Sequence, residues 1–350
     1  MSEAPARPVR VGVIGAGAIA MAHHLPALAR APGAAVVAVA DPEPGARERV
    51  RRTVDAAVHD DADALLARGD LDAVVIGAPS HLHADLAAAA ARAGLHAYIE
   101  KPVAIDAAGA ERVRRAVEAA GTIAVVGFSR RVHPLHRHAR RLMERGRIGP
   151  LVAAQTVFSE PFPPDVMPPW KRERATGGGV LLDLASHHID QLRWLAGAEV
   201  ERVSATSASV VSEQDGAWLD LHLGGGAVAQ CAFSFRGGLA DHLELIGERG
   251  TLRIDRHSGS LSLRLRRRWG YGTRGARPIP SPDLAVWRIR RPLRGPADPS
   301  FAAAIAAFVE QVRGGPAECA SLADGLRSLE VVLAAEESVR QGRPLACASS

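Results

Sequence analysis

The chain has 350 residues, of which 47% are hydrophobic and 23% charged, with a formal net charge of +5. This composition is that of a globular protein, the length suits two domains better than one, and no apolar run approaches the roughly 20 residues of a membrane span. The N-terminus also lacks the pattern of a secretory signal, so we expect a cytoplasmic protein with no membrane partner.

The first third of the chain alternates apolar strands with helix-like segments. Strands are expected at 9–17, 34–41, 71–79, 96–100 and 122–128, with helices such as 18–30 and 83–94 between them. Continuous apolar strands that alternate with helices are typical of a parallel sheet covered on both faces. The sequence therefore predicts an α/β domain with a doubly wound parallel sheet over residues 1–128.

The pattern changes after about residue 130. Helices are expected within 132–149, 177–197 and 321–342, and strands within 200–211, 217–235, 241–255 and 261–268. Strands that follow one another without crossover helices favour an antiparallel sheet. We therefore expect a second, α+β domain over residues 129–350, whose last helix can pack back on the first domain.

A glycine-rich loop follows the first predicted strand. Its sequence, Gly15-Ala16-Gly17-Ala18-Ile19-Ala20, matches the G-x-G-x-x-G/A pattern, in which the glycines allow a tight turn and bring the backbone close to a pyrophosphate at a helix N-terminus. Asp41 ends the second strand about 20 residues later, where an acid binds the ribose hydroxyls. Such an acid repels a 2′-phosphate, so NAD is favoured over NADP. The alternative is an ordinary strand-turn-helix with a capping aspartate.

Lysine is rare in this chain. Lys101 and Lys171 are the only lysines among 43 basic residues, and asparagine is absent. Because arginine does not give up its proton, a lysine retained among so many arginines indicates a role for its amine. Lys101 lies in Glu100-Lys101-Pro102, after the fifth predicted strand and at the sheet edge where ligands bind. There it can hydrogen-bond a substrate hydroxyl and relay a proton. Chance retention is the alternative, and for Lys171 the two weigh equally.

The segment GGGVLLDLASHHID, residues 177–190, contains a second group of candidate residues. If the chain is helical from residue 180, Asp183 and His187 share a face, and Asp190 follows on the same side. A histidine with a carboxylate one turn before it is an acid–base pair suited to taking a hydroxyl proton. A structural histidine is the alternative.

The remaining histidines and the cysteines do not predict a metal site. No histidine spacing matches a zinc site, and Cys231, Cys319 and Cys347 lie too far apart for a disulfide framework or a cysteine metal site. His83 is a separate case, because it follows the strand-ending Ala-Pro-Ser at 78–80 and can contact nicotinamide or substrate. No metal is expected.

An arginine-rich stretch at 264–294 carries the positive charge. Residues 263–297 include ten arginines and one acid, and the rest of the chain is slightly acidic. Nucleic-acid-binding proteins combine such a patch with a motif or stacking aromatics, and no such motif is present. We therefore expect no nucleic-acid partner. The stretch is expected to form either a solvated loop or the rim of a binding site, where it would favour an anionic substrate.

Together these segments resemble the Gfo/Idh/MocA oxidoreductases, which include glucose–fructose oxidoreductase and inositol dehydrogenase. The resemblance covers nearly the whole chain and rests on GAGAIA, APSHLH, EKP, GFSRRVHP, W…GGGVLLDLASHHID and SLADGLRSLEVVLAAEESVRQGRP. It implies an N-terminal Rossmann domain and a C-terminal α+β domain with an open, mainly antiparallel sheet that forms homodimer or homotetramer contacts. The implied activity is hydride transfer between NAD and a carbon of a sugar, sugar derivative or cyclitol.

The resemblance also implies roles for single residues. Lys101 corresponds to the catalytic lysine, Pro102 to a proline often preceded by a cis bond, and Asp183 and His187 to the carboxylate and the proton-transfer histidine. Serine at position 80 and alanine at position 185 depart from the asparagine and glycine that are usual in the family. The implied cofactor contacts are Gly15, Ala16, Gly17, Ala18, Ile19, Asp41, Ala78, Pro79, Ser80, His83, Glu100 and Lys101, and the substrate contacts are Arg131, Trp170, Lys171 and Asp190.

Two rival functions remain open at this point. One is a glycosidase that uses tightly held NAD for transient oxidation, and the other is a nucleotide-sensing regulator on the same fold. A regulator can lose the lysine and the histidine, and both are present here, so the regulator is the weaker rival.

Overall fold

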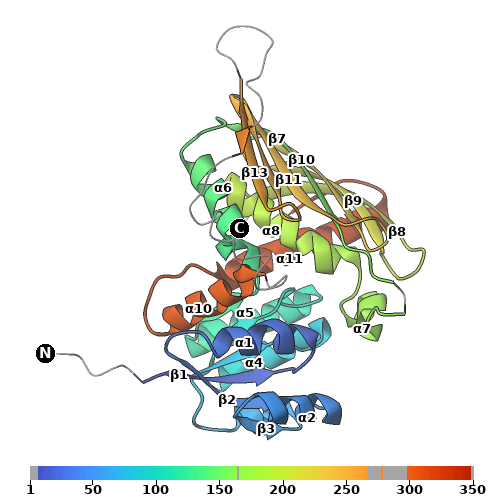
Figure 1. The fold of residues 1–350 in the computed structure, drawn as a ribbon. Helices are drawn as coiled ribbons and strands as arrows, with labels where there is room; N and C mark the ends of the chain where they lie inside the picture. Colours follow the sequence, from blue (N-terminus) through green and yellow to red (C-terminus); the bar gives the residue numbers. More distant parts are fainter. Residues whose placement is uncertain (1–6, 164, 267–276, 279–297, 348–350) are drawn as a thin grey trace, which may run out of the picture. The chain divides into compact units, whose positions relative to one another are not determined.

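The computed structural model describes residues 7–163, 165–266, 277–278 and 298–347 (Figure 1). The chain divides into two compact units, Met1–Val132 with Ala297–Leu326 and His133–Pro296 with Arg327–Ser350. We describe each unit by itself. The segment that begins at residue 297 belongs to the first unit, although the sequence pattern places it in the second domain.

The first unit is built on a seven-stranded sheet in the order β15-β6-β5-β4-β1-β2-β3. Strands β1 to β6 are all paired in parallel, and only the short β15 runs antiparallel to β6. This order confirms the predicted doubly wound sheet. The strands are β1 Val9–Ile14, β2 Ala34–Ala40, β3 Ala57–His59, β4 Ala73–Ile76, β5 His96–Ile99, β6 Ala124–Val126 and β15 Ala320–Ser321.

Helices cover this sheet, and one of them comes from the far end of the chain. Helix α10, Pro299–Val312, begins at an Asp298 cap that accepts a hydrogen bond from the Ser300 N–H at 2.9 Å. Its apolar side chains Ile305 and Phe308 join the same buried core as the strands. Burial of this apolar face explains why residues after 297 belong to the first unit. The other helices are α1 Leu25–Leu28, α2 Pro44–Thr53, α3 Ala62–Leu66, α4 His83–Arg92 and α5 Ala107–Ala120.

The second unit contains a nine-stranded sheet in the order β14-β13-β12-β11-β7-β10-β9-β8-β16. All neighbours are antiparallel except β7 and β10, which confirms a mainly antiparallel sheet. The central strand β7 was not predicted from the sequence. The strands are β7 Leu151–Ser159, β8 Val200–Ala208, β9 Gly216–Leu223, β10 Val228–Ser234, β11 Ala240–Gly247, β12 Gly250–Asp255, β13 Ser260–Leu265, β14 Arg277–Pro278 and β16 Leu345–Ala346.

Helices α6 and α8 lie against one face of this second sheet (Figure 1). Helix α6 spans Pro134–Glu144, and α8 spans Ser186–Ala196 after a π-helical turn, η5, at Leu181–Ala185. The one-turn helix α7, Pro169–Arg172, lies in the segment before η5. Helix α11, Leu322–Gln341, begins in the first unit and continues into the second.

In the described ranges, no helix combines the length and apolar character needed to cross a membrane. Most of the arginine-rich stretch 264–294 falls outside the described residues, which include only 264–266 and 277–278 of it.

Candidate functional site

The glycine loop follows β1 and leads into a π-helical turn, η1, at Ala20–His24. Gly15 has φ +91°, and a Cβ there would lie 2.7 Å from the backbone nitrogen of Ala78, so the loop packs against the end of β4 in a way that only glycine permits. A Cβ at Gly17, in contrast, would meet no atom within 4 Å. The backbone is therefore open at Gly17, where a pyrophosphate would approach it.

Asp41 follows β2 and lies beside this loop. One carboxylate oxygen accepts a hydrogen bond from the Ala16 N–H at 2.7 Å, and the other accepts from the Glu43 N–H at 2.8 Å. The structure thus brings the predicted acid to the glycine loop, where a carboxylate can bind ribose hydroxyls and disfavour a 2′-phosphate. Gly17 and Asp41 together fit a dinucleotide.

His83 is the first residue of α4 and is buried, with 2% exposure. Its Nδ1 lies 2.7 Å from the carbonyl oxygen of Pro102, and its Nε2 lies 2.7 Å from that of Ala78. Burial lowers the pKa of His83, although both carbonyls favour the charged ring. In this structure the ring contacts the backbone after β4 and the backbone after β5, and thereby connects the two loops at the sheet edge.

Glu100, Lys101 and Pro102 follow β5, and the Lys101–Pro102 peptide bond is cis. One oxygen of the Glu100 carboxylate is buried and lies 3.0 Å from Nε2 of His24. Burial opposes ionisation of Glu100, but His24 and Lys101 together lower the pKa of its carboxyl. Sequence reasoning did not assign a role to His24, because a second histidine in a helix carries no signal of a carboxylate partner.

The second group of candidates lies on η5 and α8. Asp183 is buried within the π-helical turn, and the ring of His187 lies 6.1 Å from the ring of Phe158 on β7. The predicted shared face of Asp183 and His187 assumed an α-helix from residue 180. In a π-helical turn the hydrogen bonds span five residues instead of four, so the shared face of Asp183 and His187 stays a prediction. Such turns occur frequently at functional sites, and η1 after the glycine loop is another.

The second lysine of the chain contacts one of these candidates. Nζ of Lys171 donates a hydrogen bond to Oδ2 of Asp183 at 2.7 Å. The same nitrogen lies 4.6 Å from the ring centroid of Phe162 and 5.5 Å from that of Trp170. The sequence carried no signal for this pairing, because the two residues are 12 positions apart in different elements.

The other predicted residues have less distinctive positions. Nη2 of Arg131 lies 2.9 Å from Oδ1 of Asp324 within the first unit, and the arginine is buried. Asp190 is buried on α8. Lys101 and Arg131 thus belong to the first unit, whereas Trp170, Lys171, Asp183, His187 and Asp190 belong to the second. In the part of the chain that the structure describes, no three His, Cys, Asp or Glu residues are arranged to hold a metal ion.

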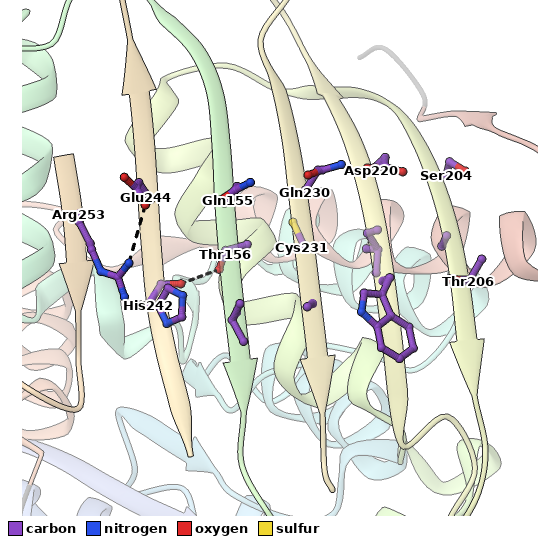
Figure 2. A pocket seen from close by; sticks show the side chains of 15 residues that line it. Gln155, Thr156, Ser204, Thr206, Asp220, Gln230, Cys231, His242, Glu244 and Arg253 are labelled. Carbon is purple, nitrogen blue, oxygen red and sulfur yellow. Dashed lines mark hydrogen bonds and ion pairs between the residues drawn. The ribbon is translucent and has the colours of Figure 1, made fainter. Parts of the chain in front are cut away.

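A shallow hollow of about 430 Å³ lies on the second sheet and contains none of the predicted site residues. Figure 2 shows side chains from adjacent strands along it, with Glu244 and Arg253 forming an ion pair at 3.8 Å. Trp218 and Val228 are exposed on β9 and β10. Register places both on the sheet face of Gln230, and Trp218 lines the hollow. The lining also includes Gln155, Ser204, Thr206, Asp220, Cys231 and His242.

Comparison with known proteins gives a consistent result for both units. Residues 9–128 match the family model described as oxidoreductase family, NAD-binding Rossmann fold. Residues 136–253 match the GFO/IDH/MocA C-terminal domain.

Curated relatives and solved structures extend this likeness along the chain. Inositol 2-dehydrogenase of Rhizobium meliloti (strain 1021) is 30% identical over 352 residues, which cover 97% of this chain and 99% of that protein. The dTDP-3,4-didehydro-2,6-dideoxy-alpha-D-glucose 3-reductase of Actinomadura kijaniata is 31% identical, over 73% of this chain and 77% of that protein. The fold is also similar to that of levoglucosan dehydrogenase in complex with NADH, with a TM-score of 0.87, 23% identity and coverage of 98% and 100%.

Proposed function

Because this chain belongs to the GFO/IDH/MocA family of oxidoreductases, whose first domain is an NAD-binding Rossmann fold, we propose that it transfers hydride between NAD and a hydroxyl-bearing carbon of a sugar, sugar derivative or cyclitol. The observation that carries this proposal is the sheet edge of the first unit. There the open Gly17 backbone, Asp41 and the Glu100-Lys101-Pro102 turn all follow parallel strands at their carboxyl ends.

We propose that NAD is preferred over NADP. NAD, when bound, supplies the hydride acceptor for the oxidative direction. The residues that would hold it are Gly15 to Ile19 in the glycine loop, Asp41, and the loops at 78–80 and 100–101. Support comes from the Asp41 carboxylate beside the Ala16 N–H, because a negative charge at that position disfavours a 2′-phosphate.

Each proposed catalytic residue has its own task. Lys101 hydrogen-bonds the substrate oxygen and stabilises its developing negative charge. His187 takes the hydroxyl proton as general base. Asp183 orients the imidazole and stabilises its charged form, as a carboxylate does for a histidine base. The reverse reaction, reduction of a keto group, uses the same residues with the proton returned.

The substrate class follows from what the relatives act on. The relatives named above include an enzyme of inositol and a reductase of a nucleotide-linked sugar, so a polyhydroxylated ring is the shared chemistry. We propose the same substrate class for the present chain. This class includes anionic sugars.

We also propose that the chain forms a homodimer or homotetramer through the open face of the second sheet. The support is the exposed side chains of Trp218 and Val228, which lie on the same face of the neighbouring strands β9 and β10. Tryptophan is enriched in protein–protein interfaces, where it supplies buried apolar area.

The test is NADH absorbance with NAD and a panel of inositols, sugars and uronic acids, for the wild type, Lys101→Arg and the exposed control Arg115→Lys on α5. We expect turnover by the wild type and the control, and a loss of about a hundredfold or more in kcat for Lys101→Arg, the size of a lost or misplaced hydrogen bond to the developing charge. If NAD binds but no polyol in the panel yields NADH, the proposed reaction is wrong. Full activity of Lys101→Arg would show that the reaction does not require a lysine at position 101.

A further inference from the structure

The structure assigns a positioning role to the second lysine: we infer that Lys171 holds the Asp183 carboxylate in place at the start of the helix that carries His187. The contact itself is independent of the reaction. Its catalytic consequence rests on the proposed function, in which Asp183 orients His187.

The ion pair is sheltered from water. Lys171 Nζ lies 2.7 Å from Asp183 Oδ2, and the two side chains are only 17% and 11% exposed. Exposed ion pairs contribute little because water and salt screen them. A pair this far removed from water is screened less, and loss of one partner removes a strong interaction from the other charge. The geometry therefore makes Lys171 a strong constraint on the position of the carboxylate.

Two aromatic rings hold the ammonium group. Its nitrogen lies 4.6 Å from the Phe162 ring centroid and 5.5 Å from that of Trp170, within the range of cation–π attraction. Helix α7 is itself tied down, because the Thr176 hydroxyl donates to the carbonyl oxygen of Trp170 at 2.8 Å. The position of the Lys171 ammonium group is thus fixed by its own contacts, and the Asp183 carboxylate binds to it.

The glycines before η5 are explained by the same arrangement. A Cβ at Gly178 would lie 2.3 Å from the carbonyl oxygen of Lys171 and 2.8 Å from that of Glu173. Only glycine lets the backbone of α7 approach the start of η5 so closely. The segment 177–179 therefore brings Lys171 within reach of Asp183, a role that the sequence did not reveal.

Both lysines of this arginine-rich chain are thus associated with the proposed catalytic residues. Lys101 is the proposed substrate-binding amine, and Lys171 contacts the proposed orienting carboxylate. Displacement of a catalytic group by about 1 Å can reduce the rate by about a hundredfold. Loss of Lys171 should therefore lower kcat, with little effect on the binding of NAD.

The contact can be tested without turnover, because only two lysine side chains can react with an amine-acylating reagent. With NAD present, acylation of each lysine is followed by peptide mass spectrometry in the wild type, Asp183→Ala and the control Glu173→Ala, which removes an exposed carboxylate nearby. We expect Lys171 to react several-fold faster in Asp183→Ala alone, with Lys101 as the internal reference. An equal rate of Lys171 acylation in all three proteins would overturn the inference.

The positioning role is tested by kinetics. We expect Lys171→Met to lower kcat by about tenfold to a hundredfold, to leave the Kd of NADH unchanged, and to move the acidic limb of the pH–rate profile to higher pH, because a positive charge next to Asp183 is lost. Lys171→Arg, which keeps the charge, should recover most of kcat, and Arg172→Met on the same helix should resemble the wild type.

The outcomes separate this inference from the proposed function. Wild-type kcat and an unmoved pH profile in Lys171→Met would reject the positioning role. A wild type without turnover on any polyol would contradict the proposed reaction. The acylation rates would still show whether Lys171 contacts Asp183.

Discussion

His83 and Pro102 are joined across the sheet edge: Nδ1 of the buried histidine lies 2.7 Å from the proline carbonyl oxygen. The opposite ring nitrogen lies 2.7 Å from the carbonyl oxygen of Ala78. Ala78 lies in a loop of proposed cofactor contacts, and Pro102 follows the proposed catalytic lysine. One imidazole therefore connects the loop after β4 to the loop after β5, and it contacts the backbone of the residue that follows Lys101.

Replacement of His83 by phenylalanine tests this connection. The ring size is nearly kept, but a carbonyl oxygen loses its imidazole N–H donor, at a cost of about 1–3 kcal/mol for a buried unsatisfied group. We expect a lower free energy of unfolding in urea and a reduced kcat, because the Lys101 backbone is less constrained. The control is Leu82→Phe, which adds a ring at the exposed neighbouring position. Unchanged stability and kcat would show that the connection is unimportant.

Asp41→Asn should change the cofactor preference. The substitution removes the negative charge next to the glycine loop while it keeps the shape of the side chain. Hydrogen bonds to a charged group are worth about 1.5–3 kcal/mol, so we expect the Kd of NADH to rise about tenfold or more. The Kd of NADPH should change much less or improve. Fluorescence titration of both cofactors measures the ratio, and an unaltered ratio would contradict the assignment of Asp41.

Glu100→Gln tests the largely buried carboxylate of the residue that precedes Lys101. Burial opposes the charge of Glu100, but His24 and Lys101 lower the pKa of its carboxyl below the ordinary value of 4.5. A lowered pKa stabilises the folded state above the unfolded pKa, and this contribution is lost as the pH falls below about 4.5. The Tm advantage of the wild type over Glu100→Gln should therefore be full at pH 6 to 7 and shrink below pH 4.5.

The matched control for this pH series is Glu118→Gln, an exposed carboxylate on α5 that is paired with Arg114. Its Tm difference from the wild type should stay small across the same pH range, because surface pairs contribute little. A Tm difference for Glu100→Gln that is constant down to pH 3.5 would mean that the Glu100 carboxylate does not stabilise the fold.

Trp218→Asp tests the proposed assembly. Trp218 is 53% exposed on β9, and a charge at this position would disfavour a buried contact between two copies of the sheet. We expect light scattering after size-exclusion chromatography to give an oligomer for the wild type and monomers for the variant. Val210→Asp, at an exposed position outside the strands, should leave the mass unchanged. A monomeric wild type would refute the proposed assembly.

The doubly wound class of the first domain was predictable because the sequence signals for its strands and loops are local. Each strand is a short apolar run, and the glycine loop and Asp41 occur at fixed distances from strand ends. The same holds for Lys101, whose position after the fifth strand and rarity in the chain both singled it out. Strand β7, by contrast, contains Gln155 and Thr156 and reads as a mixed segment, although it lies at the centre of the second sheet.

The sequence by itself therefore determined the family, the dinucleotide loop and the candidate residues, since each depends on residues near one another in the chain. Only the tertiary structure decided which side chains meet. It placed α10 in the core of the first unit, His24 against Glu100, His83 between two loops, and Lys171 on Asp183. These contacts join residues from different elements, and their geometry depends on how the helices pack on the sheets and on π-helical turns that no local pattern of hydrophobicity encodes.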